Sequence, residues 1–187
     1  MDGKHFLIKP PANSGSYFFN YKHSFNLVLL AVVDAAYKFI SVGVGCNSRI
    51  SDEGVFRNSD LYHHLEENKL NIPGWATLPG TRTKFPHVPV ADDAFPLKEY
   101  ILKPYSQIGL TKKRRIFNYH LSRPWRVVEN AFGILANRFR ISMTPISLTP
   151  SNAECITMAC CSLHNFLHCR TDASALYTPP GSIDSKD

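Results

Sequence analysis

The first 45 residues constrain the fold of this chain most, because they read as three short strands joined by turns. Residues 3–9 form one predicted strand, and residues 17–45 are rich in aromatic and β-branched side chains. A turn-like break at Asp34-Ala35-Ala36 divides the longer segment into two predicted antiparallel strands, residues 21–33 and 37–43. Together these strands predict a three-stranded antiparallel meander.

The rest of the chain carries mainly helical signals. Ser51-Asp52-Glu53 precedes spaced apolar residues and supplies an acidic first turn, which predicts a helix over residues 52–68. The apolar residues Val128, Phe132, Leu135 and Phe139 share one helical face and predict a helix over residues 122–140. Ser151 and Glu154 fit a capping box, which predicts a last helix over residues 152–170.

The segment between the first two of these helices is rich in proline and glycine. Residues 71–89 are therefore predicted to form a long irregular connection. A short strand over residues 88–92 is expected to end at Asp92, and a small helix to follow over residues 95–104.

The order of these elements predicts an α/β domain with a mixed sheet, in which parallel strands extend the meander and helices flank it. One domain over residues 1–170 accounts for most of the chain, since single domains commonly run ~100–200 residues. The short polar tail, residues 171–187, is expected to be disordered.

Charge and hydropathy narrow the choice of partners. The net charge of +6 and the pI of about 9.1 favour a polyanion such as nucleic acid, and an ordinary basic protein is the alternative. The longest apolar run, residues 27–33, is far shorter than the ~20 residues that cross a bilayer, so no membrane partner is expected. The 5 cysteines, an odd number without a secretion signal, indicate reduced thiols in the cytosol or nucleus.

Three acidic residues in distinct local settings are the candidate catalytic groups. Asp2 opens the first predicted strand, Asp92 ends a short apolar run, and Glu129 lies on the helix predicted over residues 122–140. Carboxylates from two strand ends and one helix suit Mg²⁺, which prefers oxygen ligands. Two such ions hold the attacking and leaving oxygens of a phosphodiester displacement. The chain is therefore predicted to be a metal-dependent nuclease or transposase core.

Eight segments in order carry a resemblance to a known family. They are Asp2-Gly3-Lys4-His5, Asn20-Tyr21-Lys22, Val33-Asp34-Ala35, Ser51-Asp52-Glu53-Gly54-Val55-Phe56, Asp92-Asp93-Ala94-Phe95-Pro96-Leu97, Asn118-Tyr119, Arg126-Val127-Val128-Glu129-Asn130-Ala131-Phe132-Gly133 and Leu163-His164-Asn165. Over residues 2–170 the chain resembles the PIF/Harbinger transposase-derived nucleases, which are DDE-type proteins with an RNase H-like fold.

The resemblance implies that Asp2, Asp92 and Glu129 are the catalytic, metal-binding triad and that Asp52 is a fourth metal ligand. It also implies Mg²⁺ or Mn²⁺ as the cofactor, DNA as the substrate, and a location in the nucleus, with the cytoplasm as an addition. Such families sometimes require a separate DNA-binding protein partner. Family members carry residues before the first aspartate, so we expect the first strand of this chain to be truncated.

Each acidic residue has a structural alternative. The alternative for Asp2 is a solvated residue near the chain terminus, and the alternative for Asp52 is a helix cap. Asp92 and Asp93 are adjacent, so only one points into the cluster if strand alternation continues, and the family motif selects Asp92. Asp34 is expected to occupy a hairpin turn, not a metal site.

Six basic residues between Asp92 and Glu129 are predicted to bind DNA phosphates, a contact that is independent of sequence and weakens with salt. They are Lys112, Lys113, Arg114, Arg115, Arg123 and Arg126. A nuclear-targeting signal and a solvated loop are the alternatives for residues 112–115. His164 and His168 stand four residues apart in a cysteine-containing segment that suggests zinc, but no Cys-x-x-Cys pair accompanies them, so core packing is expected.

Two functions fit these observations. The first is a metal-dependent DNA endonuclease derived from a transposase. The alternative is a catalytically inactive, domesticated transposase that acts as a DNA- or protein-binding scaffold. The expected truncation before Asp2 and Pro89 before Asp92 favour this alternative, because a ligand on a frayed terminus is poorly held and proline weakens a strand.

Overall fold

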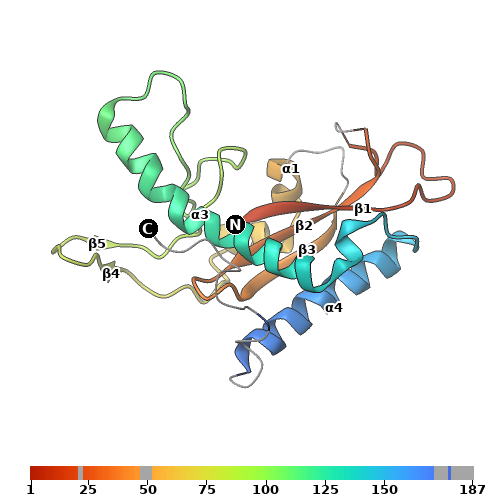
Figure 1. Ribbon diagram of the computed structural model, residues 1–187. Helices are drawn as coiled ribbons and strands as arrows, with labels where there is room; N and C mark the ends of the chain where they lie inside the picture. Colours follow the sequence, from red (N-terminus) through yellow and green to blue (C-terminus); the bar gives the residue numbers. More distant parts are fainter. Residues whose placement is uncertain (21–22, 47–51, 171–176, 178–187) are drawn as a thin grey trace.

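The computed structural model describes residues 1–20, 23–46 and 52–170, together with Tyr177. At its centre is an antiparallel sheet in the order β1 (Asp2–Leu7), β2 (Asn26–Val33) and β3 (Phe39–Cys46) (Figure 1). The predicted meander is confirmed, although β2 begins at Asn26 and not at residue 21. The segment before Asn26 closes a turn of its own, in which Asn20 Nδ2 donates to Asn26 Oδ1 over 3.0 Å.

The turn between β2 and β3 contains Asp34, as predicted. Asp34 Oδ1 accepts hydrogen bonds from the backbone N–H groups of Ala36 and Lys38, both over 2.9 Å. These bonds satisfy backbone donors that the two-strand ladder leaves open, so the side chain serves the turn.

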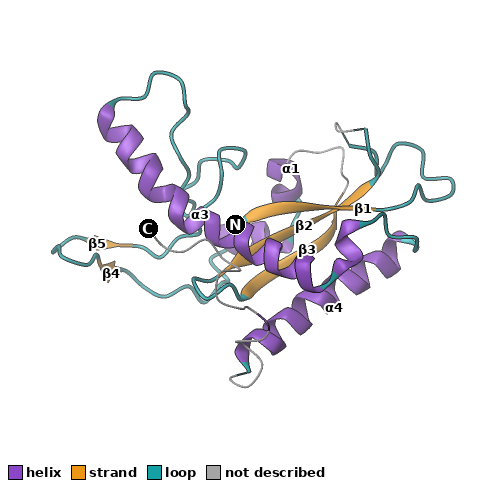
Figure 2. Cartoon of the chain, viewed as in Figure 1, coloured by secondary structure: helices purple, strands orange, loops and turns teal. Residues whose placement is uncertain are grey.

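Helices cover both faces of the sheet. They are α1 (Asp52–Arg57), α2 (Asp60–Glu66), α3 (Lys112–Arg138) and α4 (Pro150–Cys169), with a 3₁₀ turn η1 (Arg140–Met143) after α3. Leu27 and Leu29 of β2 belong to the core cluster formed with α3 and α4, whereas Val28 and Leu30 belong to the cluster formed with α1, α2 and Phe95. Figure 2 shows the sheet lying between these helices. After its first residue, Asn26, β2 is apolar along its whole length, which fits the burial of both of its faces.

The predicted parallel strands are not found in the described part of the chain. Parallel pairing there is limited to isolated bridges, of which one joins Val90 to Leu102. Pro89 lacks an N–H group, so it can only accept: the Leu102 N–H donates to the Pro89 carbonyl oxygen over 2.9 Å, and the Ala91 N–H donates to the Leu102 carbonyl oxygen over 3.0 Å. The segment that leads to Asp92 is therefore a two-bond bridge, and the predicted strand over residues 88–92 is wrong.

The single helix predicted over residues 52–68 is two helices. Ser59 separates α1 from α2, and its Oγ accepts a hydrogen bond from the Tyr62 N–H over 3.2 Å. A serine at this position favours a new helix start over continuation, because its side chain caps the free backbone donors.

The segment from residue 71 to residue 104 also differs from prediction. It contains a short hairpin, β4 (Ala76–Thr77) paired with β5 (Lys84–Phe85), where only irregular chain was expected. The helix predicted over residues 95–104 is wrong, because Ile101 N–H bonds to the Lys98 carbonyl oxygen in a tight turn. Pro96 and Pro104 flank this turn and restrict the residues before them to extended backbone.

α3 begins at Lys112 and not at residue 122, because Thr111 caps it by accepting from the Arg114 N–H over 3.4 Å. Pro124 therefore lies inside the helix, where it costs one hydrogen bond to the His120 carbonyl group. Leu121 and Val128 are buried on either side of the proline and hold both halves of the helix in place.

α4 matches the predicted last helix, but its cap differs. Thr149 is the N-cap and accepts from the Asn152 N–H over 3.4 Å, so the capping box predicted at Ser151 is wrong. Pro150 occupies the first turn, where a missing N–H group is harmless. None of the helices in the described residues is long and apolar enough to cross a membrane.

His164 of α4 has the predicted core role. Its Nε2 donates to the Tyr37 carbonyl oxygen over 2.8 Å, and its Nδ1 accepts from the Tyr177 hydroxyl group over 2.9 Å. Both ring nitrogens are thus engaged, which argues against zinc binding. The remainder of the predicted disordered tail, residues 171–176 and 178–187, lies outside the described residues.

We predict that Asn165→Asp destabilises the fold by about 2 kcal/mol. Asn165 Oδ1 accepts from the Phe39 N–H and its Nδ2 donates to the Phe39 carbonyl oxygen, both over 2.8 Å, which fixes α4 to β3. A carboxylate keeps the first bond but faces the carbonyl oxygen without a donor. Urea unfolding measures the change, and Asn137→Asp on the exposed surface of α3 is the matched control. Equal stability losses in both variants would contradict the assignment.

Candidate active site

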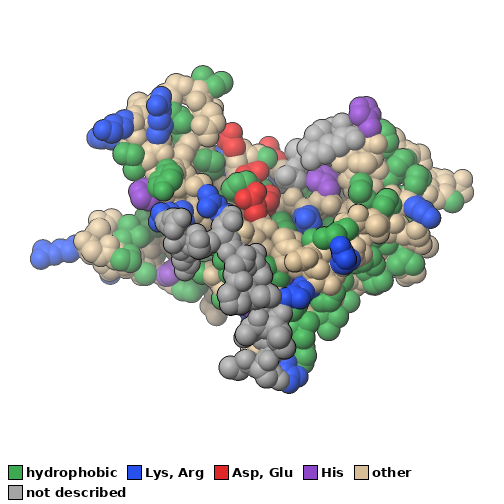
Figure 3. Space-filling model, viewed as in Figure 1, with side chains coloured by type: hydrophobic (Ala, Val, Ile, Leu, Met, Phe, Trp, Pro, Cys, Tyr) green, Lys and Arg blue, Asp and Glu red, His purple; other side chains and the backbone are tan. Residues whose placement is uncertain are grey.

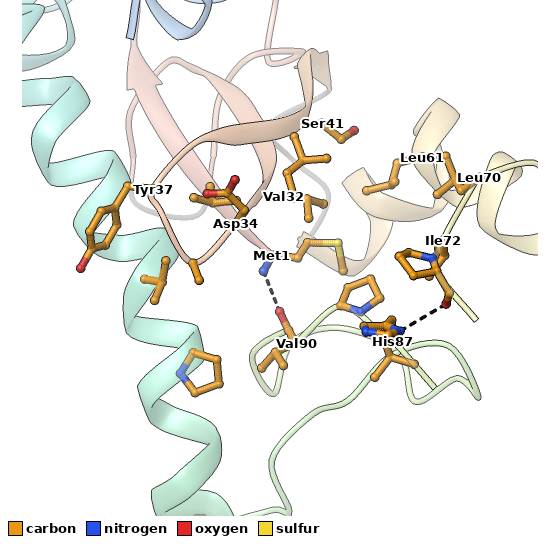
Figure 4. A pocket seen from close by; sticks show the side chains of 18 of the residues that line it. Met1, Val32, Asp34, Tyr37, Ser41, Leu61, Leu70, Ile72, His87 and Val90 are labelled. Atoms are coloured by element: carbon orange, nitrogen blue, oxygen red, sulfur yellow. Dashed lines mark hydrogen bonds between the residues drawn. The ribbon is translucent and has the colours of Figure 1, made fainter. Parts of the chain in front are cut away.

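The start of β1 is tied to the segment that carries Asp92. The Met1 side chain is buried, and its amino group donates to the Val90 carbonyl oxygen over 2.6 Å (Figure 4). Asp2 follows in β1 opposite Ala31 of β2, and its Oδ1 accepts from the Gly3 N–H over 2.8 Å. Residues that are far apart in the sequence therefore meet at this end of the sheet.

Electrostatics bring two of the predicted acids together at the Met1 amino group. Burial lowers the pKa of this group to about 6, and the carboxylates of Asp2 and Asp92 both oppose the shift. Asp92 is half-buried and its Oδ1 accepts from the Ala94 N–H over 3.0 Å. Asp93 is exposed and lies 3.5 Å from Lys103 Nζ. Of the two neighbouring aspartates, Asp92 is the one that acts on the Met1 amino group together with Asp2.

The structure shows less about the surroundings of the other two predicted metal ligands, Glu129 and Asp52. Glu129 is exposed on α3, one residue after the buried Val128. Asp52 is the first residue of α1, and its side chain lies outside the described residues. Within the described residues, no three His, Cys, Asp or Glu side chains lie close enough together to hold a metal ion. Asp2 and Asp92 thus lie on segments that the Met1–Val90 hydrogen bond ties together, and the metal-ligand set of Asp2, Asp52, Asp92 and Glu129 stays a prediction.

A residue that sequence reasoning missed lies beside this pair. Lys4 shares a face of β1 with Asp2, because side chains alternate along a strand. Its Nζ lies 5.7 Å from the centre of the Phe132 ring of α3. Burial lowers the pKa of Lys4, and Asp2 opposes the shift, so the cation and the carboxylate are neighbours. The signal in the sequence was the two-residue spacing within Asp2-Gly3-Lys4 on a predicted strand.

A cavity of about 1190 Å³ opens next to Met1. It lies between the β2–β3 turn, α2, the two ends of the 71–89 segment and the middle of α3, as Figure 4 shows in part. Its lining is mainly apolar, with Val32, Leu61 and Ile72 among the residues, and α3 adds Arg123 and Arg126. The recess is therefore lined by Met1, which precedes Asp2, and by Val90, two residues before Asp92, and it has cationic side chains on its α3 wall.

The six basic residues predicted to bind DNA all lie on α3. Lys112, Lys113, Arg114 and Arg115 are exposed in its first turn, and Arg114 lies 4.9 Å from the centre of the Tyr105 ring. Figure 3 shows acidic side chains gathered near the N-terminal end of β1, between α1 and α3. No described structural feature tests whether these basic residues bind DNA, so that role stays a prediction.

These features define an α/β protein with a carboxylate pair at the edge of its sheet and a basic helix beside it. A family model described as DDE superfamily endonuclease matches residues 1–165, and the chain belongs to this family.

Two curated relatives agree with the family and confirm the resemblance to the PIF/Harbinger group. The chain is 28% identical over 170 residues to "Protein ALP1-like" of Arabidopsis thaliana and 25% identical over 168 residues to "Putative nuclease HARBI1" of Homo sapiens. These alignments cover 89% and 88% of this chain but only 42% and 44% of the relatives. The chain thus spans less than half the length of either protein. No solved structure matches it.

Proposed function

We propose that this chain is a divalent-metal-dependent endonuclease domain with an RNase H-like core that cleaves phosphodiester bonds in DNA. Membership of the DDE superfamily endonucleases supports the reaction class. The observation that carries the proposal is the hydrogen bond from Met1 N to the Val90 carbonyl oxygen over 2.6 Å, because it ties the start of β1, where Asp2 lies, to the segment that ends at Asp92.

The chemistry of the pair fits Mg²⁺ or Mn²⁺. Mg²⁺ is commonly held by one or two carboxylates together with phosphate oxygens of the substrate, so a pair is sufficient. When bound, such an ion supplies an activated water or 3′-hydroxyl nucleophile and neutralises charge on the phosphate. Asp2 and Asp92 would hold it, and their own contribution is to fix its position relative to the DNA.

The packing of β1 against α3 supports Glu129 as the third acid. β1 and the second half of α3 run side by side in the same general direction (Figure 1), and Lys4 meets Phe132 across their interface. Asp2 lies two residues before Lys4, a rise of about 6.6 Å in a strand. Glu129 lies three residues before Phe132 on the same helix face, a rise of about 4.5 Å. Asp2 and Glu129 thus lie in the same direction from this contact.

The basic residues complete the proposed site. Arg123 and Arg126 border the cavity beside Met1, and the four basic residues of the first turn extend the same helix outward. Cations in this position would bind DNA phosphates and hold the strand near the acids. Lys4 would add a positive charge next to Asp2. We place this activity in the nucleus, where DNA is the substrate.

Purified protein is expected to nick supercoiled plasmid DNA with Mg²⁺ or Mn²⁺ and to leave it intact in EDTA. Glu129→Gln is expected to remove this nicking, because it keeps the shape of the side chain and deletes its charge. Glu99→Gln is the matched control, since Glu99 is also exposed but is not among the residues that line the cavity. Nicking that persists in EDTA, or that survives in Glu129→Gln as fully as in Glu99→Gln, would reject the proposed site.

A further inference from the structure

Two parts of the domain project from it on the same side. One is the start of α3, residues 112–120, here the helix arm; the other is the segment around β4 and β5, residues 71–87, here the hairpin arm (Figure 1). Every residue from 71 to 85 is exposed, and the first buried residue of α3 is Leu121. Neither arm therefore contributes to the core that holds the domain together.

The hairpin arm is nevertheless ordered by its own hydrogen bonds. Leu78 N–H donates to the Thr83 carbonyl oxygen over 3.0 Å, which closes the turn beyond the two paired strands. At the base of the arm, His87 Nδ1 donates to the Gly74 carbonyl oxygen over 2.8 Å. A two-stranded hairpin is only marginally stable on its own in water. Four large apolar side chains are nevertheless exposed on this arm, and their gathering marks the arm as a surface for a partner: Ile72 at 39%, Trp75 at 67%, Leu78 at 42% and Phe85 at 38%.

The charge of both arms identifies the partner as a polyanion. Residues 68–91 and 100–128 contain no Asp or Glu but hold 10 of the 21 Lys and Arg residues of the chain. Figure 3 shows Lys and Arg side chains at the outer ends of both arms. In the hairpin arm these are Arg82 at the tip and Lys84 in β5. A basic surface without acidic side chains attracts the dense negative charge of the DNA phosphate backbone.

The two arms flank the candidate active site. The cavity beside Met1 is lined at one side by Ile72 and His87 from the base of the hairpin arm, and at the other by Arg123 of α3. A molecule that contacts both arms would therefore lie next to the recess lined by Met1 and Val90. The major groove of duplex DNA admits either an α-helix or a two-stranded β-ribbon, which are the two kinds of element found here.

We infer that the hairpin arm is a second DNA-binding element, which binds the duplex opposite the helix arm. Arg82 and Lys84 contact phosphates. Pairing of Thr77 with Lys84 puts both on one face of the hairpin, and Trp75 shares that face through strand alternation, so its ring packs against the DNA beside them. The inference rests on the proposed function for the substrate, but it concerns binding and not cleavage.

Fluorescence anisotropy with a labelled duplex in EDTA tests the inference without any cleavage. Arg82→Ala/Lys84→Ala is expected to raise Kd about tenfold at moderate salt and to reduce the salt slope by about 2, for two lost phosphate contacts. The matched control is Lys9→Ala/Arg140→Ala, which removes the same charge from exposed positions away from both arms. An equal loss of affinity in both double variants, or no loss in either, would overturn the inference.

Tryptophan fluorescence gives a second measurement that does not depend on charge. The chain has 2 tryptophans, so Trp125→Phe leaves Trp75 as the reporter. The buried Trp125 Nε1 has no hydrogen-bond partner among the described residues, so this change removes no bond. Duplex DNA is expected to change the Trp75 emission, and an unchanged spectrum at saturation would refute a contact at this arm.

These results are separable from those on cleavage. Binding that depends on the hairpin arm without metal-dependent nicking would uphold the inference and reject the proposed function. Metal-dependent nicking by the unmodified protein, together with equal DNA affinity in the two double variants, would uphold the proposed function and overturn the inference. Preference for single-stranded over duplex DNA would also overturn the inference, because the inference places a DNA duplex between the two arms.

Discussion

Asp92→Asn is expected to reduce metal-dependent DNA nicking about a thousandfold, the scale on which a single electrostatic group of an active site acts. The variant keeps the size of the side chain and the hydrogen bond from the Ala94 N–H, since the asparagine oxygen can also accept it. It removes the negative charge that acts, together with that of Asp2, on the Met1 amino group. A loss of activity with unchanged stability would therefore report the charge and not the fold.

Asp93→Asn is the matched control for this experiment. Asp93 is adjacent to Asp92 and has the same chemistry, but it is exposed and pairs with Lys103 over 3.5 Å. Exposed pairs of this kind contribute about 0–1 kcal/mol, so the control is expected to keep both fold and activity. Mn²⁺ titration of the two variants gives a reading independent of turnover, in which only Asp92→Asn should lose affinity. Equal activity in the two variants would remove Asp92 from the site.

Local patterns predicted the elements of the fold where the pattern and the packing agree. The apolar run of β2 and the helical spacing around Phe132 could be recognised in the sequence, because these residues form the core. The start of α3 was missed because its first turns carry basic residues that touch no core and so leave no apolar period. The hairpin of β4 and β5 was missed for the same reason, since all of its residues are exposed.

The candidate site could be predicted only as a set of residues. The sequence shows acids in strand and helix settings, but the approach of Asp92 to Asp2 depends on the hydrogen bond between Met1 and Val90. Such a long-range contact leaves no periodic signal. The contact between Lys4 and Phe132 likewise depends on how α3 packs on β1. The proposed position of Glu129 near Asp2 depends on the same packing.

The same limit applies to α4, where His164 is hydrogen-bonded to two residues from other segments of the chain. It lies fully buried on α4 and binds the Tyr37 carbonyl oxygen and the Tyr177 hydroxyl group. A carbonyl oxygen can only accept, so Nε2 carries the proton and Nδ1 accepts from Tyr177. The neutral ring is therefore fully satisfied, and a second proton would need the Tyr177 hydroxyl group to turn from donor to acceptor.

His164→Ala is expected to lower the free energy of unfolding by about 3–4 kcal/mol, because it leaves a cavity and two polar groups without their partner. His168→Ala is the comparison: His168 stacks on the same ring at 5.7 Å but is only partly buried, and its loss is expected to cost much less. Urea unfolding at neutral pH measures both. Similar losses would show that the buried hydrogen bonds of His164 are not what stabilises this region.

The burial of His164 also predicts how stability changes with pH. Desolvation lowers the pKa of His164 from its usual 6.5, the hydrogen bond to Tyr37 opposes the shift, and His168 adds to it. As pH falls below 6.5, the unfolded chain takes up a proton at this residue that the folded protein does not, so stability falls. One proton contributes at most about 1.4 kcal/mol per pH unit to this slope. His164→Gln removes the titrating group while keeping a donor and an acceptor, so its unfolding free energy should fall less between pH 6.5 and 5. An identical slope in His164→Gln and the unmodified protein would mean that other groups set the acid sensitivity.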